Sequence, residues 1–373
     1  MAWTYGQHQR SARIFASCLG CGASLASVMR RLGLSTSTVR RKAIKNLSRS
    51  WPQKDVPVAW AWAGAKPGTA RRRRVGSSTS CERVSDIVGM YDAFTFDFDE
   101  LLQVAHEDDV LECLLKLCQS GRKVVLISEY PGRAALYKDQ LQEKGMNVDS
   151  LAGVVTAGEL LHQYLSLQQQ RLGRKVLWIA ASPDLTAPED QLRLLEHGYQ
   201  PEANIDEVDF ILCTGGRAVF AATDYQEAST FTENGEAEPF RPLFRQAASR
   251  GLPLLCLGTR EEHVVDGKCS FLPSRLASSY KHFAGKVVHF GRPQTAVFDE
   301  VLRLLEDAGM GLLEAKVAHI GLCPDRDVAG ALNAGVSAVL LQDCRRSVEH
   351  SEGDDETVTS KGNPTIELES FCW

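Results

Sequence analysis

Short apolar runs alternate with longer amphipathic stretches from about residue 91 onward. The near-continuous apolar runs predict buried strands at 91–97, 124–128, 176–179, 209–213, 254–257, 317–320 and 337–341. The stretches between them carry apolar residues at helical spacing and predict helices, among them 110–118, 134–144 and 298–308. Apolar strands that alternate with helices indicate a doubly wound α/β fold, in which a parallel sheet is covered on both faces.

Polar side chains follow several of these predicted strands. Asp97 and Asp99 come at the end of the first strand, Ser128 ends the second, Arg292 precedes a predicted helix, and Asp327 follows the strand that ends at residue 320. Open α/β sheets bind their ligands beyond the carboxyl ends of the strands. Carboxylates, a hydroxyl and a cation are the groups needed to transfer a phosphoryl group through an aspartyl phosphate around Mg²⁺. The sequence therefore predicts a site for phosphoryl transfer.

The order of these motifs resembles the haloacid dehalogenase (HAD) superfamily, and in particular its class IIA subgroup of nitrophenylphosphatase-like and sugar-phosphate phosphatases. The resemblance covers about residues 90–345. Residues 128–133 are similar to the second motif of the family, residues 291–293 to its Gly-Lys-Pro, and residues 321–335 to its last motif. The resemblance implies a HAD-like core with an inserted cap domain.

The resemblance also implies roles for individual residues. Asp97 stands at the position of the nucleophile and Asp99 at that of the general acid/base. Ser128 stands where the family holds the transferring phosphoryl group, and Arg292 where a lysine neutralises it. The implied cofactor is Mg²⁺, with Asp97, Asp99 and Asp327 as its ligands, and the implied substrate is a small phosphorylated metabolite.

Two residues depart from the motifs of the family. Glu100 replaces a glycine in the loop that wraps the phosphate, where its side chain crowds the loop and its charge repels an anion. Leu322 replaces an acidic ligand of Mg²⁺ and cannot supply an oxygen. Two functions therefore remain open: Mg²⁺-dependent hydrolysis of a phosphomonoester, and a non-catalytic subunit, a pseudoenzyme, with a structural role in an organellar assembly or ribonucleoprotein.

The length and texture of the chain predict its division into domains. The HAD-like core is expected at 91–144 and 286–346, with an α/β cap domain inserted at 145–285. A basic N-terminal segment is expected at 1–90, and an acidic C-terminal tail at 347–373.

Charge separates the N-terminal segment from the rest of the chain. Residues 1–90 carry 16 Lys and Arg against 3 Asp and Glu, whereas residues 91–373 carry 26 against 44. Such a segment is typical of a mitochondrial or plastid transit peptide, which predicts an organellar location, with a cytoplasmic one as the alternative. Three other interpretations stay open: a helix-turn-helix at 24–41, an arm that contacts RNA or a protein partner, and a nuclear signal at 71–74.

The 11 cysteines follow no repeating spacing, which indicates reduced thiols in an intracellular protein. Cys18 and Cys21 form a C-x-x-C pair that could contribute to a metal site, although no second pair follows at zinc-finger spacing. No apolar run approaches the roughly 18 residues that span a bilayer, so no membrane span is predicted.

Overall fold

The computed structural model describes residues 79–181, 197–221, 224–227, 230–265, 268–342 and 364–373. These described residues all belong to one compact unit. The predictions made for residues 1–78 lie outside the described residues: the targeting segment, the helix-turn-helix, the Cys18 and Cys21 pair, the four-arginine run and the RNA-contacting arm. Most of the predicted acidic tail, residues 347–363, lies outside them as well, as do residues 343–346 of the predicted core.

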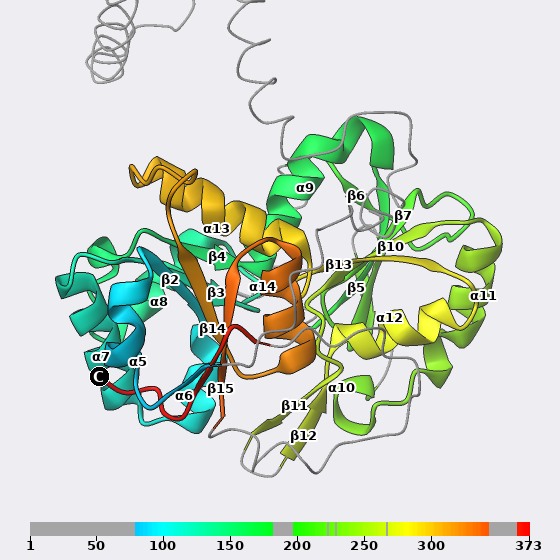
Figure 1. The fold of residues 1–373 in the computed structure, drawn as a ribbon. Helices are drawn as coiled ribbons and strands as arrows, with labels where there is room; N and C mark the ends of the chain where they lie inside the picture. Colours follow the sequence, from blue (N-terminus) through cyan, green and yellow to red (C-terminus); the bar gives the residue numbers. More distant parts are fainter. Residues whose placement is uncertain (1–78, 182–196, 222–223, 228–229, 266–267, 343–363) are drawn as a thin grey trace, which may run out of the picture. The chain divides into compact units, whose positions relative to one another are not determined.

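The first sheet has seven strands, and every neighbouring pair in it is parallel. Its order is β1 (Thr79–Cys81), β16 (Ile366–Leu368), β15 (Ser337–Leu341), β14 (Val317–Gly321), β2 (Ala93–Asp97), β3 (Lys123–Ser128) and β4 (Gly153–Thr156). Every residue of β2 and β14 is buried, as expected for central strands that are covered on both faces (Figure 1).

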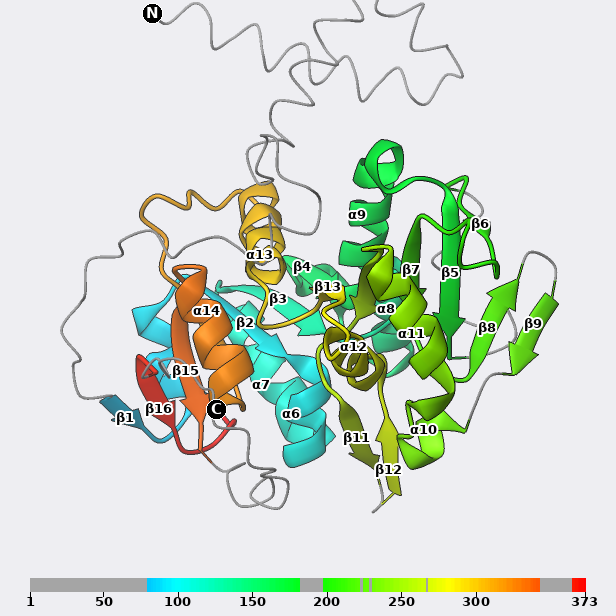
Figure 2. The ribbon, with the colours of Figure 1, turned by 90° about the vertical axis from the view of Figure 1, so that its right-hand side faces the viewer.

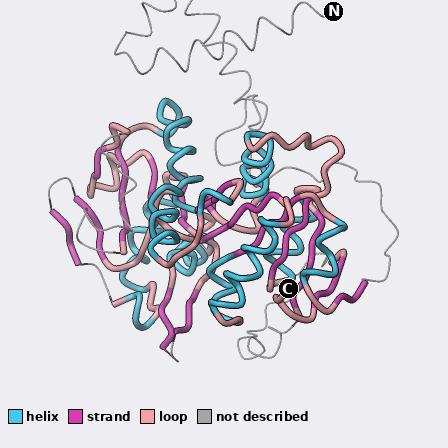
Figure 3. The backbone as a smooth tube through the Cα atoms, turned by 90° about the vertical axis from the view of Figure 1, so that its left-hand side faces the viewer, coloured by secondary structure: helices cyan, strands magenta, loops and turns pink. Residues whose placement is uncertain are grey.

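Helices cover both faces of this sheet. Those connected to it are α5 (Val84–Ile87), η2 (Val88–Met90), α6 (Phe98–Val104), α7 (Glu107–Gln119), α8 (Ala134–Glu143), η3 (Val148–Ser150), α13 (Thr295–Asp307), the π-helical turn η6 (Pro324–Val328) and α14 (Ala329–Asn333). Buried side chains of α7 and α8 share one apolar cluster with β2 and β3. Helix α13 contacts β3 and β4, and its buried residues lie outside that cluster, which places α13 on the opposite face. Figure 3 shows the helices packed around the strands.

The second sheet also has seven strands. Its order is β13 (Lys286–Phe290), β10 (Pro253–Leu257), β7 (Phe210–Cys213), β5 (Lys175–Ala180), β8 (Ala218–Ala221) and β9 (Asp224–Glu227), with β6 (Gln200–Pro201) also paired to β5. The strands from β13 to β5 pair in parallel, whereas β8 pairs antiparallel with β5 and with β9. The accompanying helices are α9 (Ala157–Leu172), α10 (Phe231–Asn234), η5 (Glu238–Phe240), α11 (Arg241–Ser249) and α12 (Pro273–Lys281). The strands β11 (Glu262–Val265) and β12 (Lys268–Phe271) form a separate antiparallel pair.

The structure shifts the predicted domain boundaries. The predicted cap, 145–285, includes β4, which belongs to the first sheet, and excludes β13, which belongs to the second. At the chain ends, β1 and β16 pair with each other at one edge of the first sheet, so residues 79–90 and 364–373 are part of the core rather than an extension and a tail (Figure 2). None of the helices in the described residues is both long and apolar enough to cross a membrane.

Candidate active site

The residues predicted for the site come together at the carboxyl edge of the first sheet. Asp97 is the last residue of β2, Ser128 is the last residue of β3, and Asp327 lies in η6, directly beyond β14. Arg292 arrives from the second sheet, two residues after the end of β13. Because β2, β3 and β14 run in parallel, their ends meet at the same edge. The structure therefore brings Asp97, Ser128, Arg292 and Asp327 to one edge of the sheet, and their roles there stay a prediction.

The guanidinium of Arg292 links two of these carboxylates. Its Nη2 donates to Oδ2 of Asp97, and its Nη1 donates to Oδ1 of Asp327. The Arg292 side chain is fully buried, and the two carboxylates are almost fully buried. Burial opposes the charge of Arg292, but Asp97, Glu100 and Glu129 outweigh that effect and raise the pKa of the guanidinium. A permanent cation thus lies between two aspartates.

The remaining oxygens of both aspartates accept backbone hydrogen bonds. Oδ1 of Asp97 accepts from the Glu100 amide at 3.0 Å. Oδ2 of Asp327 accepts from the amides of Leu322 and Cys323 at 2.7 and 2.9 Å. Burial raises the pKa of Asp97 although Arg292 lowers it, and the nearby carboxylates add to the rise. All four carboxylate oxygens of this pair therefore already have a donor within the chain.

Asp99 is turned toward a different set of partners. Its Oδ2 accepts from the Ser128 hydroxyl, and its Oδ1 accepts from the Tyr137 hydroxyl at 2.5 Å. The Ser128 oxygen in turn accepts from the amide of Tyr130 at 2.9 Å. Burial and the charge of Asp99 raise the pKa of Tyr137, so its hydroxyl stays protonated and remains a donor. Asp99 and Ser128 thus satisfy each other rather than facing Asp97.

Glu100 lies where the sequence departs from the family motif, and three arginines compensate its negative charge. Its Oε1 lies 2.6 Å from Arg326, 3.3 Å from Arg260 and 3.5 Å from Arg292. Burial opposes the charge of Glu100, yet the three arginines outweigh it and lower the pKa of the carboxyl group. The sequence indicated that Glu100 would repel an anion; the structure adds that it is held as an anion itself.

Sequence analysis did not identify four residues of this site: Glu129, Tyr137, Arg260 and Arg326. Glu129 accepts from the Arg292 amide at 3.3 Å, and burial raises its pKa. Glu129 and Arg326 lie within stretches that carry the motifs, so proximity to the motifs was the available signal for these two, whereas Arg260 lies outside those stretches. Tyr137 lies on α8, where an aromatic residue at helical spacing is indistinguishable from an ordinary core residue.

The donors present do not fit Mg²⁺. The cation needs a near-octahedral shell of oxygens that point at one centre. The six carboxylate oxygens of Asp97, Asp99 and Asp327 all accept hydrogen bonds from the chain, and the Arg292 cation lies between two of the three groups. Leu322 adds no ligand. Among the described residues, no three His, Cys, Asp or Glu side chains are placed to share a metal ion.

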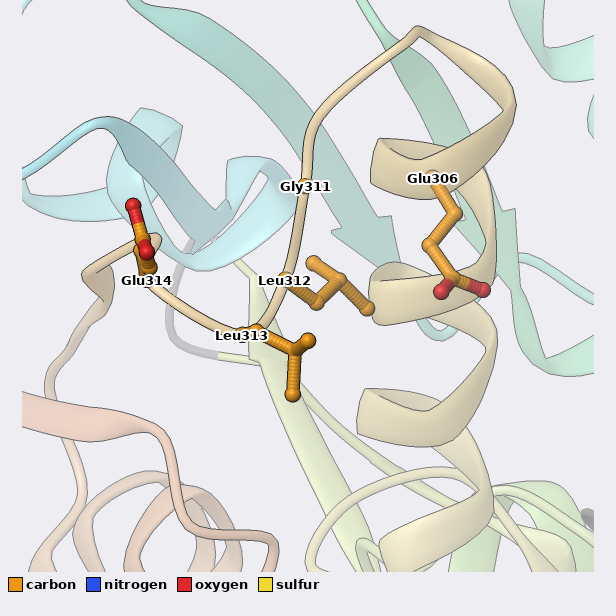
Figure 4. Close-up of a pocket in the computed structure, with 5 residues that line it drawn as sticks. All are labelled: Glu306, Gly311, Leu312, Leu313 and Glu314. Atoms are coloured by element: carbon orange, nitrogen blue, oxygen red, sulfur yellow. The ribbon is translucent and has the colours of Figure 1, made fainter. Parts of the chain in front are cut away.

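A hollow in the part of the fold that surrounds the first sheet does not supply an alternative phosphate site. It measures about 550 Å³ and is lined by Glu306, Gly311, Leu312, Leu313 and Glu314, at the end of α13 and in the loop that follows (Figure 4). Two leucines and two carboxylates offer a phosphate no donor and no positive charge. None of the predicted site residues lines this hollow.

Comparison with known proteins gives no match by sequence: neither a family model nor a curated protein matches the chain. Similarity is found among solved structures. A hydrolase of the haloacid dehalogenase-like family from Brucella suis superposes with a TM-score of 0.59 at 19% identity, covering 78% of this chain and 99% of that one. This chain has the haloacid dehalogenase-like fold.

Two further structures agree with this assignment of the HAD-like fold. A possible sugar phosphatase of the HAD superfamily from Cytophaga hutchinsonii gives a TM-score of 0.56 at 13% identity and covers 78% of this chain and 98% of that one. A single mutant of a thermostable NPPase from Geobacillus stearothermophilus gives 0.52 at 14% identity, covering 75% and 96%. The HAD-like fold class predicted from the sequence is confirmed.

Proposed function

We propose that this chain is a HAD-like protein that does not hydrolyse phosphomonoesters and that acts as a non-catalytic subunit of a larger assembly. One observation carries the proposal: the Arg292 guanidinium occupies the space between Asp97 and Asp327 and pairs with both. The Asp97 carboxylate is buried, and its two oxygens already accept from Arg292 and from the Glu100 amide, so the pairing with a cation lowers its nucleophilicity.

The basic N-terminal segment supports the second half of the proposal. With 16 basic residues against 3 acidic ones, residues 1–90 suit an acidic partner such as RNA or an acidic protein surface, or import into an organelle such as the mitochondrion. Binding of the full chain to RNA is expected to weaken steeply with salt, and replacing Arg71 to Arg74 by glutamine is expected to weaken it further.

A second candidate function is Mg²⁺-dependent hydrolysis of a small phosphorylated metabolite through Asp97. It is favoured by the convergence of Asp97, Asp99, Ser128, Arg292 and Asp327 at one edge of the sheet. This function requires the Arg292 side chain to move out from between Asp97 and Asp327.

The test measures p-nitrophenyl phosphate turnover by the full chain, with and without Mg²⁺, beside the Asp97→Asn variant. We expect equal background rates from both proteins and no response to Mg²⁺. Metal-dependent turnover that Asp97→Asn abolishes would contradict the proposal and establish the second candidate.

A matched pair of variants tests the reason for inactivity. The triple change Glu100→Gly, Arg292→Lys and Leu322→Asp restores the residues that the family motifs have at these positions. We expect Mg²⁺ to raise the thermal midpoint of this variant in a saturable way, because binding to the folded state alone stabilises it. The double variant that keeps Leu322 is the control and should respond far less, since it lacks the restored carboxylate ligand.

A further inference from the structure

Three arginine side chains from separate segments converge on one carboxylate. Arg260 follows β10 of the second sheet, Arg292 follows β13, and Arg326 lies in η6 beyond the first sheet. Their nitrogens lie 3.3, 3.5 and 2.6 Å, respectively, from Oε1 of Glu100. The chain therefore gathers three permanent positive charges around a single small group.

Only one oxygen of the Glu100 carboxylate contacts the three arginines. All three arginines approach its Oε1, whereas its Oε2 is buried with no hydrogen-bond partner among the described residues. Close to Glu100 in space, Nε of Arg292 is a buried donor without an acceptor among the described residues. Each guanidinium offers five N–H donors in a planar fork. A carboxylate bound through one oxygen satisfies few of them, and a tetrahedral anion with four oxygens satisfies more.

We propose that Arg260, Arg292 and Arg326 form a binding site for a small inorganic oxyanion such as phosphate, and that Glu100 fills this site as an internal occupant. The side chain of Arg292 is 0% exposed, and those of Arg260 and Arg326 are 28% and 21% exposed. Arg260 and Arg326 are therefore partly accessible to a small ion from solvent. Glu100 and the ion compete for the same arginines.

Glu100 is well placed for this competition. It is the third residue of α6, and its backbone amide is fixed by Asp97 at 3.0 Å, so a movement of its side chain alone removes its contacts with the three arginines, of which Arg292 stays paired with Asp97 and Asp327. Arg260 comes from the segment that follows β10, so the occupant also links the two sheets. Removal of the Glu100 carboxylate leaves three buried or half-buried cations without this partner, and a replacement anion then relieves the cost.

The test is titration of the full chain with inorganic phosphate, followed by calorimetry and by the thermal midpoint, at constant ionic strength. We expect Glu100→Ala to bind phosphate at least roughly tenfold more tightly than the wild type, because the internal competitor is gone. Adding Arg326→Ala to that variant should weaken phosphate binding by roughly tenfold, since the nearest cation is lost. Glu143→Ala, at an exposed acidic residue on α8, controls for the change in net charge and should behave as the wild type.

Equal phosphate affinities of the wild type and Glu100→Ala overturn the proposal, whether both bind or neither does. If Glu100→Ala does not fold, Glu100→Gln replaces it, because the amide keeps the volume of the side chain and removes its charge. Glu100→Gln should then bind phosphate more tightly than the wild type, and equality again overturns the proposal. The measurement reports binding and not turnover, so its outcome is independent of whether the chain hydrolyses phosphate esters.

Discussion

Arg292 reaches two carboxylates at once because a guanidinium carries separate nitrogens in one plane. Its Nη1 and Nη2 donate to Asp327 and Asp97, respectively, whereas the single nitrogen of a lysine cannot hold both groups in the same geometry. The pairing is fully buried, where an uncompensated charge is costly. At this residue, the chain itself supplies the positive charge that two clustered aspartates need.

His289 is a second residue whose charge state follows from its surroundings. It lies on β13, and its Nδ1–H donates to the carbonyl oxygen of Gly258 at 3.1 Å. Burial lowers the pKa of His289 to about 4, and the positive charge of Lys281 adds to the decrease. The imidazole is therefore neutral in the folded chain at neutral pH.

This shift predicts how stability depends on pH. The unfolded chain protonates His289 near its ordinary pKa of about 6.5, whereas the folded chain protonates it only near 4, so the unfolded state binds more protons between these values. We expect His289 to lower the free energy of unfolding as pH falls through this window, by up to about 1.4 kcal/mol per pH unit. Urea unfolding at several pH values between these limits measures the effect.

The control variant is His289→Asn, whose side-chain amide can still donate to the Gly258 carbonyl but does not titrate. The difference in unfolding free energy between wild type and variant removes the contribution of all other titrating groups. A difference that stays constant across the window would show that His289 is protonated alike in both states.

At the scale of elements, the start of α9 is fitted closely against the loop that follows β3. The Thr156 hydroxyl caps α9 by accepting from the Glu159 amide at 3.0 Å, and it donates to the Gly132 carbonyl at 2.8 Å. A Cβ atom at Gly158 would lie 1.9 Å from the Pro131 carbonyl oxygen. The loop directly after Ser128 is thus positioned by a glycine in the first turn of α9.

We expect Gly158→Ala to destabilise the fold by about 1–3 kcal/mol, because the added methyl group meets rigid backbone and forces the loop or the helix to shift. Denaturant unfolding measures the loss. Gly89→Ala is the matched control, since an added Cβ there meets nothing within 4 Å. If both variants unfold at the same denaturant concentration, the contact at Gly158 does not constrain the loop.

The elements that the sequence predicted share one property: their apolar runs are continuous. β2, β3, β7 and β10 were predicted because neighbouring residues are apolar on both faces. β13 was missed because Lys286 and His289 interrupt its apolar pattern, and β4 was missed because Gly153 and Thr156 leave only two large apolar residues in it. Strand order and register depend on contacts between distant segments, which no local pattern contains.

The same distinction applies to the site. Motif order along the chain identified Asp97, Asp99, Ser128, Arg292 and Asp327, because each follows a strand or precedes a helix. It could not give the hydrogen bonds between them, which join residues up to 195 positions apart. The pairing of Arg292 with two aspartates, on which the proposed function rests, is such a long-range property.

At the scale of the whole molecule, the two ends of the described chain meet at one edge of the first sheet, and the C-terminal segment reaches the strand that carries Asp97. β1 pairs with β16, and the Val84 amide donates to the Cys372 carbonyl at 3.0 Å. The ring of Phe371 packs edge-on against Phe96 of β2, with 5.5 Å between ring centroids. The sequence predicted an acidic tail here because residues 347–356 are acidic and polar, and that composition concealed a short strand at 366–368, whose two apolar residues are buried.

The last ten residues are therefore expected to contribute to the stability of the core. Phe371 is 5% exposed, and its replacement by alanine removes the contact with Phe96 and leaves a cavity. We expect Phe371→Ala to lower the free energy of unfolding by about 3–5 kcal/mol. Glu369→Ala, at an exposed position of the same segment, should change it by about 0.5 kcal/mol or less. Urea unfolding of both variants measures the two effects, and a Phe371→Ala variant as stable as Glu369→Ala would mean that the C-terminal segment does not pack on β2 in solution.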